Sequence, residues 1–377
     1  MESLPDRAMV VVVGGGVAAM RLAEGLARSG ADVVALAPEP YLGDLFDGRD
    51  LGLITPGLAE HPHRLVAAIG EDGARDLHSW TRASATGLGS LVRPVPMLRA
   101  SAGEGEDPDI DADLSVLALL GFPADALNPE SVRPRLGTDA FGQGHCTPGW
   151  GLVSPGDALA TMYASATSAG ARVYTDARAL SFHDELADVC VVTTRGAVKA
   201  DVVILAGDWR MRDLDPWCAD KVVPVRRHFA RYAPPPDGAP SPVALSAQHG
   251  WLRARIDPDG SLIVSGARWA SPHFEMGETE MSVQPGILDA LDRLVAQRFP
   301  RWHAAGRTHA WVGIAAHTCD QLPIVGPLPG RSSIIACFGW NGRPWAMATR
   351  AADAVVAGLS EPDVRPVTPW LRARRFV

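Results

Sequence analysis

The stretch "MVVVVGGGVAAMRLAEGLARSGADVVALAPEP", residues 9–40, constrains the fold of this chain more than any other. A short valine run, typical of a buried parallel strand, leads directly into Gly14–Gly16, and residues 20–28 carry apolar side chains at helical spacing. Gly30 ends that helix, and "ADVVALA" predicts a second strand. Strand, tight turn, helix and strand in this order predict the start of a Rossmann-type sheet.

The glycines of this turn fit the phosphate-binding fingerprint G-x-G-x-x-A. Gly14 allows the tight turn, Gly16 lets the backbone approach a pyrophosphate, and Ala19 lets the helix pack closely on the strand. The helix begins near Val17 and Ala18, where unpaired N–H groups and the helix dipole favour an anion. The sequence therefore predicts a nucleotide-binding site made by these five residues.

The second predicted strand lacks the acidic residue that usually accepts the ribose hydroxyls. Ala37 stands at that position, and Glu39 follows two residues later, beyond Pro38. Three interpretations stay open: Glu39 reaches the ribose from the loop, the backbone and Arg49 hold the ribose, or Glu39 is only a solvated loop charge.

Composition excludes several classes of function. The chain of 377 residues has a net charge of −8, which gives no support for binding nucleic acid or an anionic membrane. Its five cysteines form no C-x-x-C pair, so they predict reduced thiols in a cytoplasmic protein and no zinc site. We see no apolar run of membrane-spanning length and no secretory signal before the first strand. The oligomeric state is not predicted.

A longer pattern lies near the C-terminus. "WVGIAAHTCDQLPIVGPLPGRSSIIACFGWNGRPWAMATRAADAVVAGL" resembles the C-terminal signature of the FAD-dependent amine and amino-acid oxidases, the superfamily of D-amino-acid, glycine and sarcosine oxidases. The matching residues are Trp311, Gly313, Asp320, Pro323, Ile324, Gly326 and Gly342. Three shorter stretches, "GLVSPGDAL", "ADVVILAGDW" and "GSLIVSGARW", are similar to the same family in the same order. The resemblance runs from about residue 9 to the closing "RRF".

This resemblance implies a mixed α/β fold. It consists of a discontinuous, Rossmann-like FAD-binding domain with an inserted substrate domain on a mixed, mainly antiparallel sheet. We expect the FAD domain to comprise residues 1–90, 150–222 and 305–377. The substrate domain would then comprise residues 91–149 and 223–304.

The resemblance also implies FAD as the cofactor. We expect the flavin to be non-covalent, because Cys319 lies outside the spacing of the cysteine that sarcosine oxidases link to it. Beyond the glycine turn, Glu39 and Arg49, the positions that match the family's flavin contacts are Asp50, Leu51, Gly52, Ala179, Ala206, Gly207, Asn341, Gly342, Arg343 and Pro344.

The sequence departs from the family where the substrate is bound. Glycine oxidases hold the substrate carboxylate with arginines, and the matching positions here are Ala315 and Trp340. The resemblance therefore implies an aromatic pocket. Its candidate catalytic residues are Trp269, His317 and Arg343, and its candidate substrate contacts are Trp251, Arg268, Trp340, Glu60 and His61. Core packing is the alternative role for each tryptophan, and a structural hydrogen bond is the alternative for His317.

Two further stretches are rich in polar side chains. "GLAEHPHRL" brings Glu60, His61 and His63 close together, but nothing else in the sequence supports a metal site, so we predict none. Glu60 and His61 are placed instead at the substrate entrance. "SAGEGEDPDIDADLS", residues 101–115, is predicted to be a surface loop.

Together these features favour an FAD-dependent oxidase or dehydrogenase that oxidises the C–N bond of a secondary amine or an N-substituted amino acid. Hydride would pass to the flavin, the imine would hydrolyse, and molecular oxygen is a candidate acceptor. Two alternatives stay open: a flavin enzyme acting on an unusual biosynthetic intermediate without oxygen, and a catalytically silent FAD-binding subunit. A nicotinamide-dependent dehydrogenase would not explain the C-terminal pattern.

Overall fold

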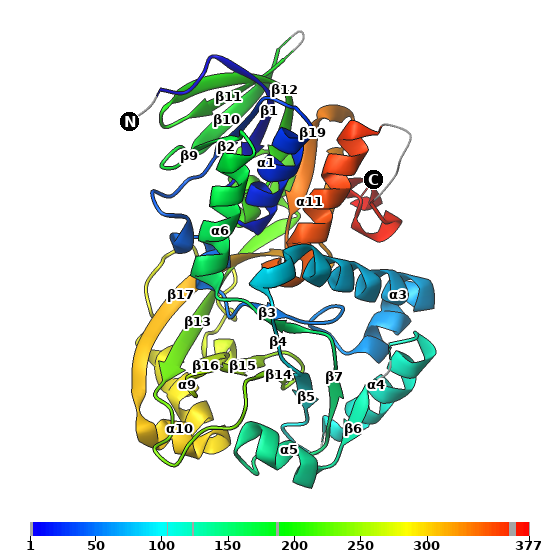
Figure 1. Cartoon of the computed structure of the whole chain (residues 1–377), viewed down its shortest axis with the longest axis vertical. Coiled ribbons are helices and arrows are strands. Elements are labelled where there is room, and N and C mark those ends of the chain that lie inside the picture. The colour runs from blue at the N-terminus through cyan, green and yellow to red at the C-terminus, as the bar shows by residue number, and fades with distance from the viewer. Residues whose placement is uncertain (1–2, 104, 123, 186–187, 362–366, 377) are drawn as a thin grey trace. The chain divides into compact units, whose positions relative to one another are not determined.

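The computed structural model describes residues 3–103, 105–122, 124–185, 188–361 and 367–376. The chain forms two compact units. Unit 1 comprises residues 1–50, 154–225 and 314–377, and unit 2 comprises residues 51–153 and 226–313. Two long strands, β13 (Val222–Tyr232) and β17 (Arg307–Thr318), have residues in both units. Figure 1 labels the elements.

Unit 1 is built on a mostly parallel sheet, whose parallel strands follow the order β9–β2–β1–β12–β19. Their bounds are β1 (Arg7–Val13), β2 (Val33–Leu36), β9 (Arg172–Tyr174), β12 (Gly196–Leu205) and β19 (Arg331–Phe338). Antiparallel strands β10 (Ala179–Asp184), β11 (Val189–Thr193) and β18 (Ile324–Leu328) extend the sheet. Val11 pairs with Val34 and Val203, and all three side chains are buried. The unbroken apolar runs are those of a sheet covered on both faces.

The order of the parallel strands creates a switch point in unit 1. From β1 the chain moves outward to β2 and β9, and it then returns to the other side of β1 for β12. The carboxyl ends of β1 and β12 therefore open beside each other, which is where ligands bind in open α/β sheets.

Helices of unit 1 cover this sheet. α1 (Val17–Arg28) packs against α6 (Pro155–Ser168) and α11 (Pro344–Ser360), as Figure 1 shows. Proline stands in the first turn of α6 and of α11, where its missing N–H costs no hydrogen bond. The shorter helical segments of unit 1 are η1 (Leu42–Asp44), α2 (Phe46–Arg49), η3 (Asp208–Arg210), α7 (Met211–Leu214), α8 (Pro216–Ala219), η5 (Pro369–Leu371) and η6 (Ala373–Phe376).

Unit 2 is built on a mainly antiparallel sheet in the order β13–β16–β15–β14–β5–β7–β6, with β17 beside β13. Its other strands are β5 (Met97–Ala100), β6 (Asp125–Leu127), β7 (Gly144–Thr147), β14 (Val243–Ala247), β15 (Leu252–Ile256) and β16 (Leu262–Ser265). A small second sheet joins β3 (Leu53–Ile54), β8 (Gly151–Leu152) and β4 (Arg93–Pro94). The helical segments are α3 (Pro62–Leu88), η2 (Gly89–Leu91), α4 (Asp107–Leu119), α5 (Pro129–Leu136), η4 (Arg268–Ala270), α9 (Pro285–Arg298) and α10 (Pro300–Ala305).

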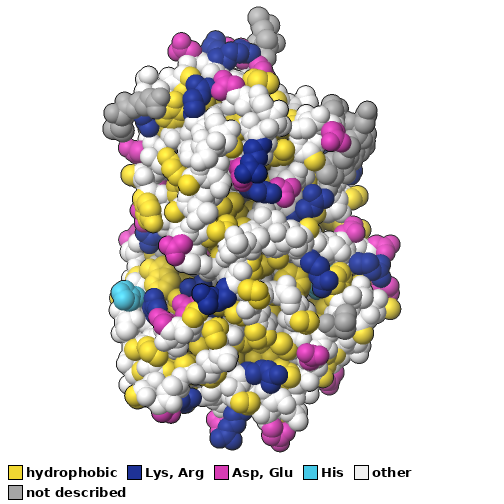
Figure 2. Space-filling view, in the orientation of Figure 1, with side chains coloured by type: hydrophobic (Ala, Val, Ile, Leu, Met, Phe, Trp, Pro, Cys, Tyr) yellow, Lys and Arg dark blue, Asp and Glu magenta, His cyan; other side chains and the backbone are white. Residues whose placement is uncertain are grey.

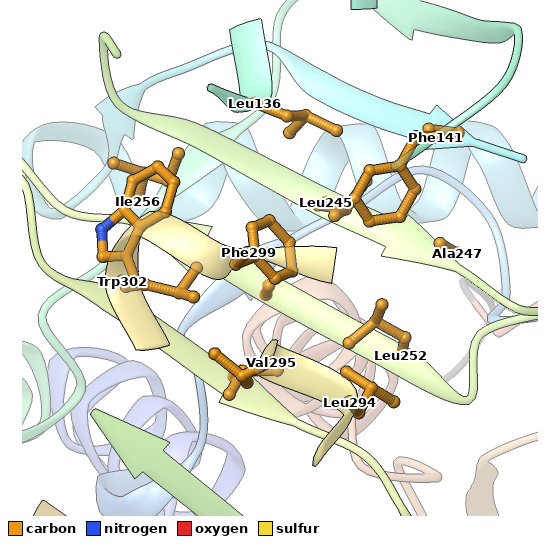
Figure 3. Close-up of a cluster of buried hydrophobic side chains, with 14 of the residues drawn as sticks. Leu136, Phe141, Leu245, Ala247, Leu252, Ile256, Leu294, Val295, Phe299 and Trp302 are labelled. Carbon is orange, nitrogen blue, oxygen red and sulfur yellow. The ribbon is translucent and has the colours of Figure 1, made fainter. Parts of the chain in front are cut away.

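The core of unit 2 lies between this sheet and the helices α9 and α10 (Figure 3). Phe299 and Trp302 meet edge to face with ring centroids 6.0 Å apart, and they pack with Leu252 and Ile256 of β15. The indole N–H of Trp302 donates to the Gly260 carbonyl at 2.9 Å, so the buried polar atom is satisfied.

The predicted α/β fold is confirmed, but one element was predicted wrongly. Residues 101–115 were expected to be a surface loop, whereas most of them form α4. Pro108 and the acidic side chains of its first turn suit a helix N-terminus, and Ile110 and Leu117 are buried on one face. The compact units also divide the chain differently from the predicted domains, since residues 51–90 belong to unit 2.

One face of the molecule shows mixed charge. Figure 2 shows acidic and basic side chains interspersed over the face in view, with no large patch of one sign. Among the described residues, no helix is both long and apolar enough to cross a membrane.

Candidate functional site

The glycine turn of unit 1 borders a pocket at the switch point. Gly14–Gly16, Asp47, Ala206–Arg210 and Trp340 line it. Gly14 has a φ of +148°, and a Cβ there would lie 2.3 Å from the Ala206 carbonyl oxygen. Only glycine therefore lets β1 and β12 approach this closely.

Asp47 occupies the N-terminus of α1. Its Oδ2 accepts a hydrogen bond from the Val17 N–H at 2.7 Å, and the same oxygen would lie 2.2 Å from a Cβ on Gly16. Asp47 is buried, and burial, reinforced by the nearby Asp208, raises the pKa of its carboxyl to about 8. The acid is therefore mainly protonated at neutral pH, when it adds no negative charge to the place where the turn would receive a phosphate.

Asp208 follows β12 and is hydrogen-bonded to β17 and to the turn that follows β19. It has a φ of +54°, and its carboxylate accepts from the Ala316 N–H at 2.7 Å and the Gly339 N–H at 3.3 Å. Desolvation raises the pKa of Asp208 to about 6. The predicted contacts Ala206 and Gly207 directly precede it at the end of β12.

The loop after β2 is held by ion pairs. Ala37 is buried, and its N–H donates to the Tyr174 carbonyl at 2.9 Å. Glu39 accepts from Arg210 Nη2 at 2.5 Å, and Arg49 donates to the Asp44 carboxylate at 2.6 Å. Glu39 is therefore more than a solvated loop charge, because Arg210 lines the turn pocket.

The glycine turn before α11 is tightly bonded. Asn341, with a φ of +53°, accepts from the Thr318 N–H and donates to the Gly339 carbonyl, each at 2.9 Å. Trp340 and Arg343 are buried, and Gly342 has a φ of +70°. Pro344 then begins α11.

His317 and Ala315 lie in the unit 1 part of β17. Ala315 is buried, whereas His317 is half-buried. Both neighbours of His317 are anchored through their backbone N–H groups, Ala316 to Asp208 and Thr318 to Asn341. The imidazole points to the opposite face of the strand from its neighbours.

The other predicted cofactor residues divide between the units. Asp50 is buried in unit 1, and Ala179 begins the edge strand β10. Leu51 and Gly52 belong to unit 2, where the Leu51 carbonyl accepts from Arg255 Nη1 at 2.5 Å. Gly52 has a φ of +66°, and a Cβ on it would meet the Val153 carbonyl oxygen at 2.4 Å.

Of the predicted aromatic residues of unit 2, Trp251 lies in an exposed group with Arg268 and Phe274. The Arg268 guanidinium lies 5.0 Å from the ring centroid of Trp251, whose ring is 5.5 Å from that of Phe274. Arg268 Nη1 donates to the Phe274 carbonyl at 3.2 Å. Trp251 is 38% exposed and Trp269 is 51% exposed, so neither belongs to the core.

His61 and Glu60 differ in their surroundings. Glu60 is exposed, whereas the side chain of His61 is fully buried, and Nδ1 of His61 lies 2.6 Å from the Asp113 carboxylate. The His61 side chain thus has no surface at the predicted substrate entrance. Burial alone would raise the pKa of Asp113, but the imidazoles of His145 and His61 hold it well below its usual range.

Three features of unit 1 fit the phosphate-binding turn of a dinucleotide cofactor: a small pocket at the switch point, a turn that only glycine permits, and the N-terminus of α1 beside that pocket. Sequence analysis missed Asp47 and Asp208. The signal for Asp208 was its position directly after the Ala-Gly that ends β12. No comparable sequence signal marked Asp47, because its contact with the Val17 N–H joins residues 30 positions apart.

Comparisons with known proteins agree with this arrangement. A family model described as "FAD dependent oxidoreductase" (DAO) matches residues 9–357. The probable oxidoreductase OrdL of Rhizobium meliloti is 24% identical over 344 residues, which is 87% of this chain and 78% of that protein. Glycine oxidase from Geobacillus kaustophilus superimposes with a TM-score of 0.77 at 20% identity, covering 97% of each chain. L-Proline dehydrogenase from P. horikoshii superimposes with a TM-score of 0.81 at 16% identity, covering 99% of this chain and 98% of that one.

Proposed function

The chain belongs to the DAO family of FAD-dependent oxidoreductases, and we propose that it oxidises the C–N bond of a secondary amine or an N-substituted amino acid. The family match over residues 9–357 is the observation that carries the proposal. The similar structures support it, since glycine oxidase and L-proline dehydrogenase are both named for amino acids.

FAD, when bound, accepts the hydride from the carbon that carries the nitrogen. The residues of the chain bind and orient the reactants. We assign the pyrophosphate to the glycine turn, Gly14–Ala19, and to the N-terminus of α1. The ribose would be recognised by Glu39 with Arg210, and the backbone of Ala206, Gly207 and residues 341–344 would line the flavin.

The flavin would be held without a covalent bond. Cys319 is exposed and outside the family's linkage spacing, and the thiols of Cys218 and Cys337 are buried. Burial raises the pKa of Cys337, which leaves it protonated and unreactive. Acid precipitation should therefore release all of the flavin into solution, whereas flavin in the pellet would contradict this assignment.

The substrate would be larger and more apolar than glycine. Ala315 and Trp340 replace the arginines that the resemblance led us to expect, and both are buried. Trp340 lines the turn pocket, and Trp251 presents an exposed aromatic face beside Arg268. We assign Trp251 and Trp269 of unit 2 as apolar substrate contacts and Arg268 of the same unit as the partner of a substrate carboxylate.

The test is an anaerobic reduction screen of the FAD-loaded protein. N-alkyl and N-aryl amines and cyclic amino acids are added without oxygen, and the flavin absorbance is followed. We expect rapid bleaching with secondary amines that carry a large apolar group, and slow bleaching with glycine and with sarcosine, the smallest N-alkyl amino acid. Faster bleaching by glycine than by any secondary amine would refute the substrate assignment. Mixing the reduced protein with oxygen then shows whether oxygen is the acceptor.

A second candidate, a catalytically silent FAD-binding subunit, is favoured by one observation. Asp47 already occupies the Val17 N–H at the N-terminus of α1, where an enzyme of this fold receives the pyrophosphate. Retention of FAD with no bleaching by any amine, together with normal reduction by dithionite, would support this candidate over the enzyme.

A further inference from the structure

We propose that unit 2 binds a divalent transition-metal ion of the zinc class through His61, Asp109 and His249. This inference does not depend on the proposed oxidoreductase function, because all three residues belong to unit 2 and none belongs to the glycine-turn pocket. The ligands are two imidazole nitrogens and a carboxylate oxygen, a donor set that zinc sites use.

The three donor atoms converge. Each can supply one ligand atom, and the atoms all lie within 4.8 Å of one another. His61 Nε2 is 4.0 Å from Asp109 Oδ2, and His249 Nδ1 is 3.4 Å from the same oxygen. Zn–N and Zn–O bonds of about 2.0–2.1 Å at tetrahedral angles would separate donors by about 3.3–3.4 Å. Small side-chain movements therefore suffice to close the site.

The Nε2 atom of His61 lacks a hydrogen-bond partner among the described residues, although the side chain is completely buried. Its nearest charged atoms are Glu106 Oε1 at 3.7 Å and Asp109 Oδ2, both beyond hydrogen-bond distance. His249 Nδ1 is also without a hydrogen bond there. Buried imidazole nitrogens are normally satisfied, and an ion would satisfy both.

Asp113 contacts the other ring nitrogen of His61, as a carboxylate commonly does beside a metal-binding histidine. Its Oδ2 lies 2.6 Å from Nδ1 of His61, a contact that favours a proton on Nδ1 in the neutral ring and would leave Nε2, 4.0 Å from Asp109 Oδ2, free to bind an ion. The other oxygen of Asp113 lies 2.8 Å from Nδ1 of His63. His61, His63 and Asp113 form a second group of possible ligands. In that group both imidazoles are already hydrogen-bonded to the Asp113 carboxylate, which favours His61, Asp109 and His249 as the ligands.

Glu106 holds the third ligand in place. Its carboxylate accepts from the backbone N–H groups of Gln248 at 3.0 Å and His249 at 2.9 Å. These two residues have φ values of +52°, an unfavourable conformation for non-glycine residues. The carboxylate thus maintains a strained turn between β14 and β15 that directs His249 toward His61, since their ring centroids are 5.2 Å apart.

The charges around the site admit a cation. Asp109, Asp113 and Glu106 contribute three carboxylates, against two cations. The buried Arg99 guanidinium acts electrostatically on His61 and Asp113, and Arg64 Nη2 donates to Asp109 Oδ2 at 2.7 Å from a half-exposed side chain. Metal-ligating carboxylates are commonly hydrogen-bonded in this way. Asp109 and His249 are partly exposed, which gives an ion a path to the buried nitrogen of His61.

A chelator competition titration tests the proposal. The full-length, FAD-loaded protein is stripped with a chelator and titrated with Zn²⁺ against a chromophoric zinc chelator. We expect one equivalent of zinc per chain, and a loss of affinity of at least about tenfold in both His249→Ala and Asp109→Asn. His303→Ala, an exposed histidine elsewhere in unit 2, is the matched control and should bind as the wild type does.

His61→Ala is not needed, since emptying a fully buried position can unfold the chain. The alternative is that His61 is an imidazolium ion paired with Asp113 and Glu106, with no metal. Absence of stoichiometric zinc binding, or equal zinc affinity in His249→Ala and the wild type, would overturn the proposal and favour that alternative. Co²⁺ absorption bands that disappear in His249→Ala would independently support it.

Discussion

The carboxyl of Asp47 provides a direct test of how the glycine turn works. Its pKa is raised to about 8 by burial and by Asp208, whereas an aspartic acid in an unfolded chain titrates near about 3.9. Between these two values the folded chain binds the proton more tightly than the unfolded chain. The stability that this group contributes is therefore complete below about pH 4 and is lost as the pH rises through about 8.

The size of the effect follows from the same numbers. Each pKa unit corresponds to about 1.4 kcal/mol, so a difference of about four units sets an upper limit of roughly 5–6 kcal/mol at alkaline pH. Relaxation and water entry reduce such penalties, and we expect roughly 2–4 kcal/mol. Asp47→Asn is neutral at every pH, and its amide oxygen can still accept the Val17 N–H. The variant should therefore become increasingly more stable than the wild type as the pH rises.

The assay is urea unfolding of the flavin-free protein between pH 4.5 and 8.5, with wild type and Asp47→Asn measured in parallel. Asp213→Asn, whose side chain is 67% exposed, is the control and should follow the wild type throughout. FAD affinity, measured by quenching of flavin fluorescence, should favour Asp47→Asn most strongly above pH 8, because an ionised Asp47 repels a pyrophosphate. Parallel stability curves for Asp47→Asn and the wild type would refute the reasoning.

Three further changes test other parts of the structure. Gly16→Val should yield protein without bound FAD, seen as loss of the flavin absorbance in folded protein, because its Cβ would meet the Asp47 carboxyl; retention of flavin would argue against the site. Arg268→Leu should raise KM for carboxylate-bearing amines by about 10- to 100-fold and leave amines without a carboxylate little changed, from a charge-assisted bond of about 1.5–3 kcal/mol. Trp302→Ala should lower the free energy of unfolding by about 3–5 kcal/mol, and a loss below about 1 kcal/mol would show that the indole does not fill the unit 2 core.

Local patterns predicted unit 1 well. The valine run before Gly14, the glycine fingerprint and the prolines at the starts of α6 and α11 each have a local cause, so β1, α1, α6 and α11 could be predicted without knowledge of contacts. The strand order around β1 was not visible in these patterns and was not predicted.

The prediction from sequence was wrong for one polar stretch that forms a helix. Residues 101–115 were interpreted as a loop because acidic side chains outnumber apolar ones there, yet the buried spacing of Ile110, Asp113 and Leu117 is helical. Burial of Asp113 depends on His61 and His63, which lie far away in the sequence. The prediction of no metal site considered only Glu60, His61 and His63, and it did not foresee that Asp109 and His249 lie near His61.

At the end of β2, where the usual acidic residue is missing, a tertiary contact pairs Glu39 with Arg210, which lines the turn pocket. Ala37 packs directly onto the turn, since its methyl group would lie 2.7 Å from a Cβ on Gly15, so a longer acidic side chain there would have to bend away from the turn. Glu39 lies further along the loop and is oriented by Arg210, which follows Asp208 at the end of β12. The pair supplies both an acceptor and donors beside the pocket, whereas a lone acid supplies only an acceptor. The ribose recognition that we propose would therefore depend on two segments, and loss of Arg210 would release the carboxylate of Glu39 as well as remove its own donors.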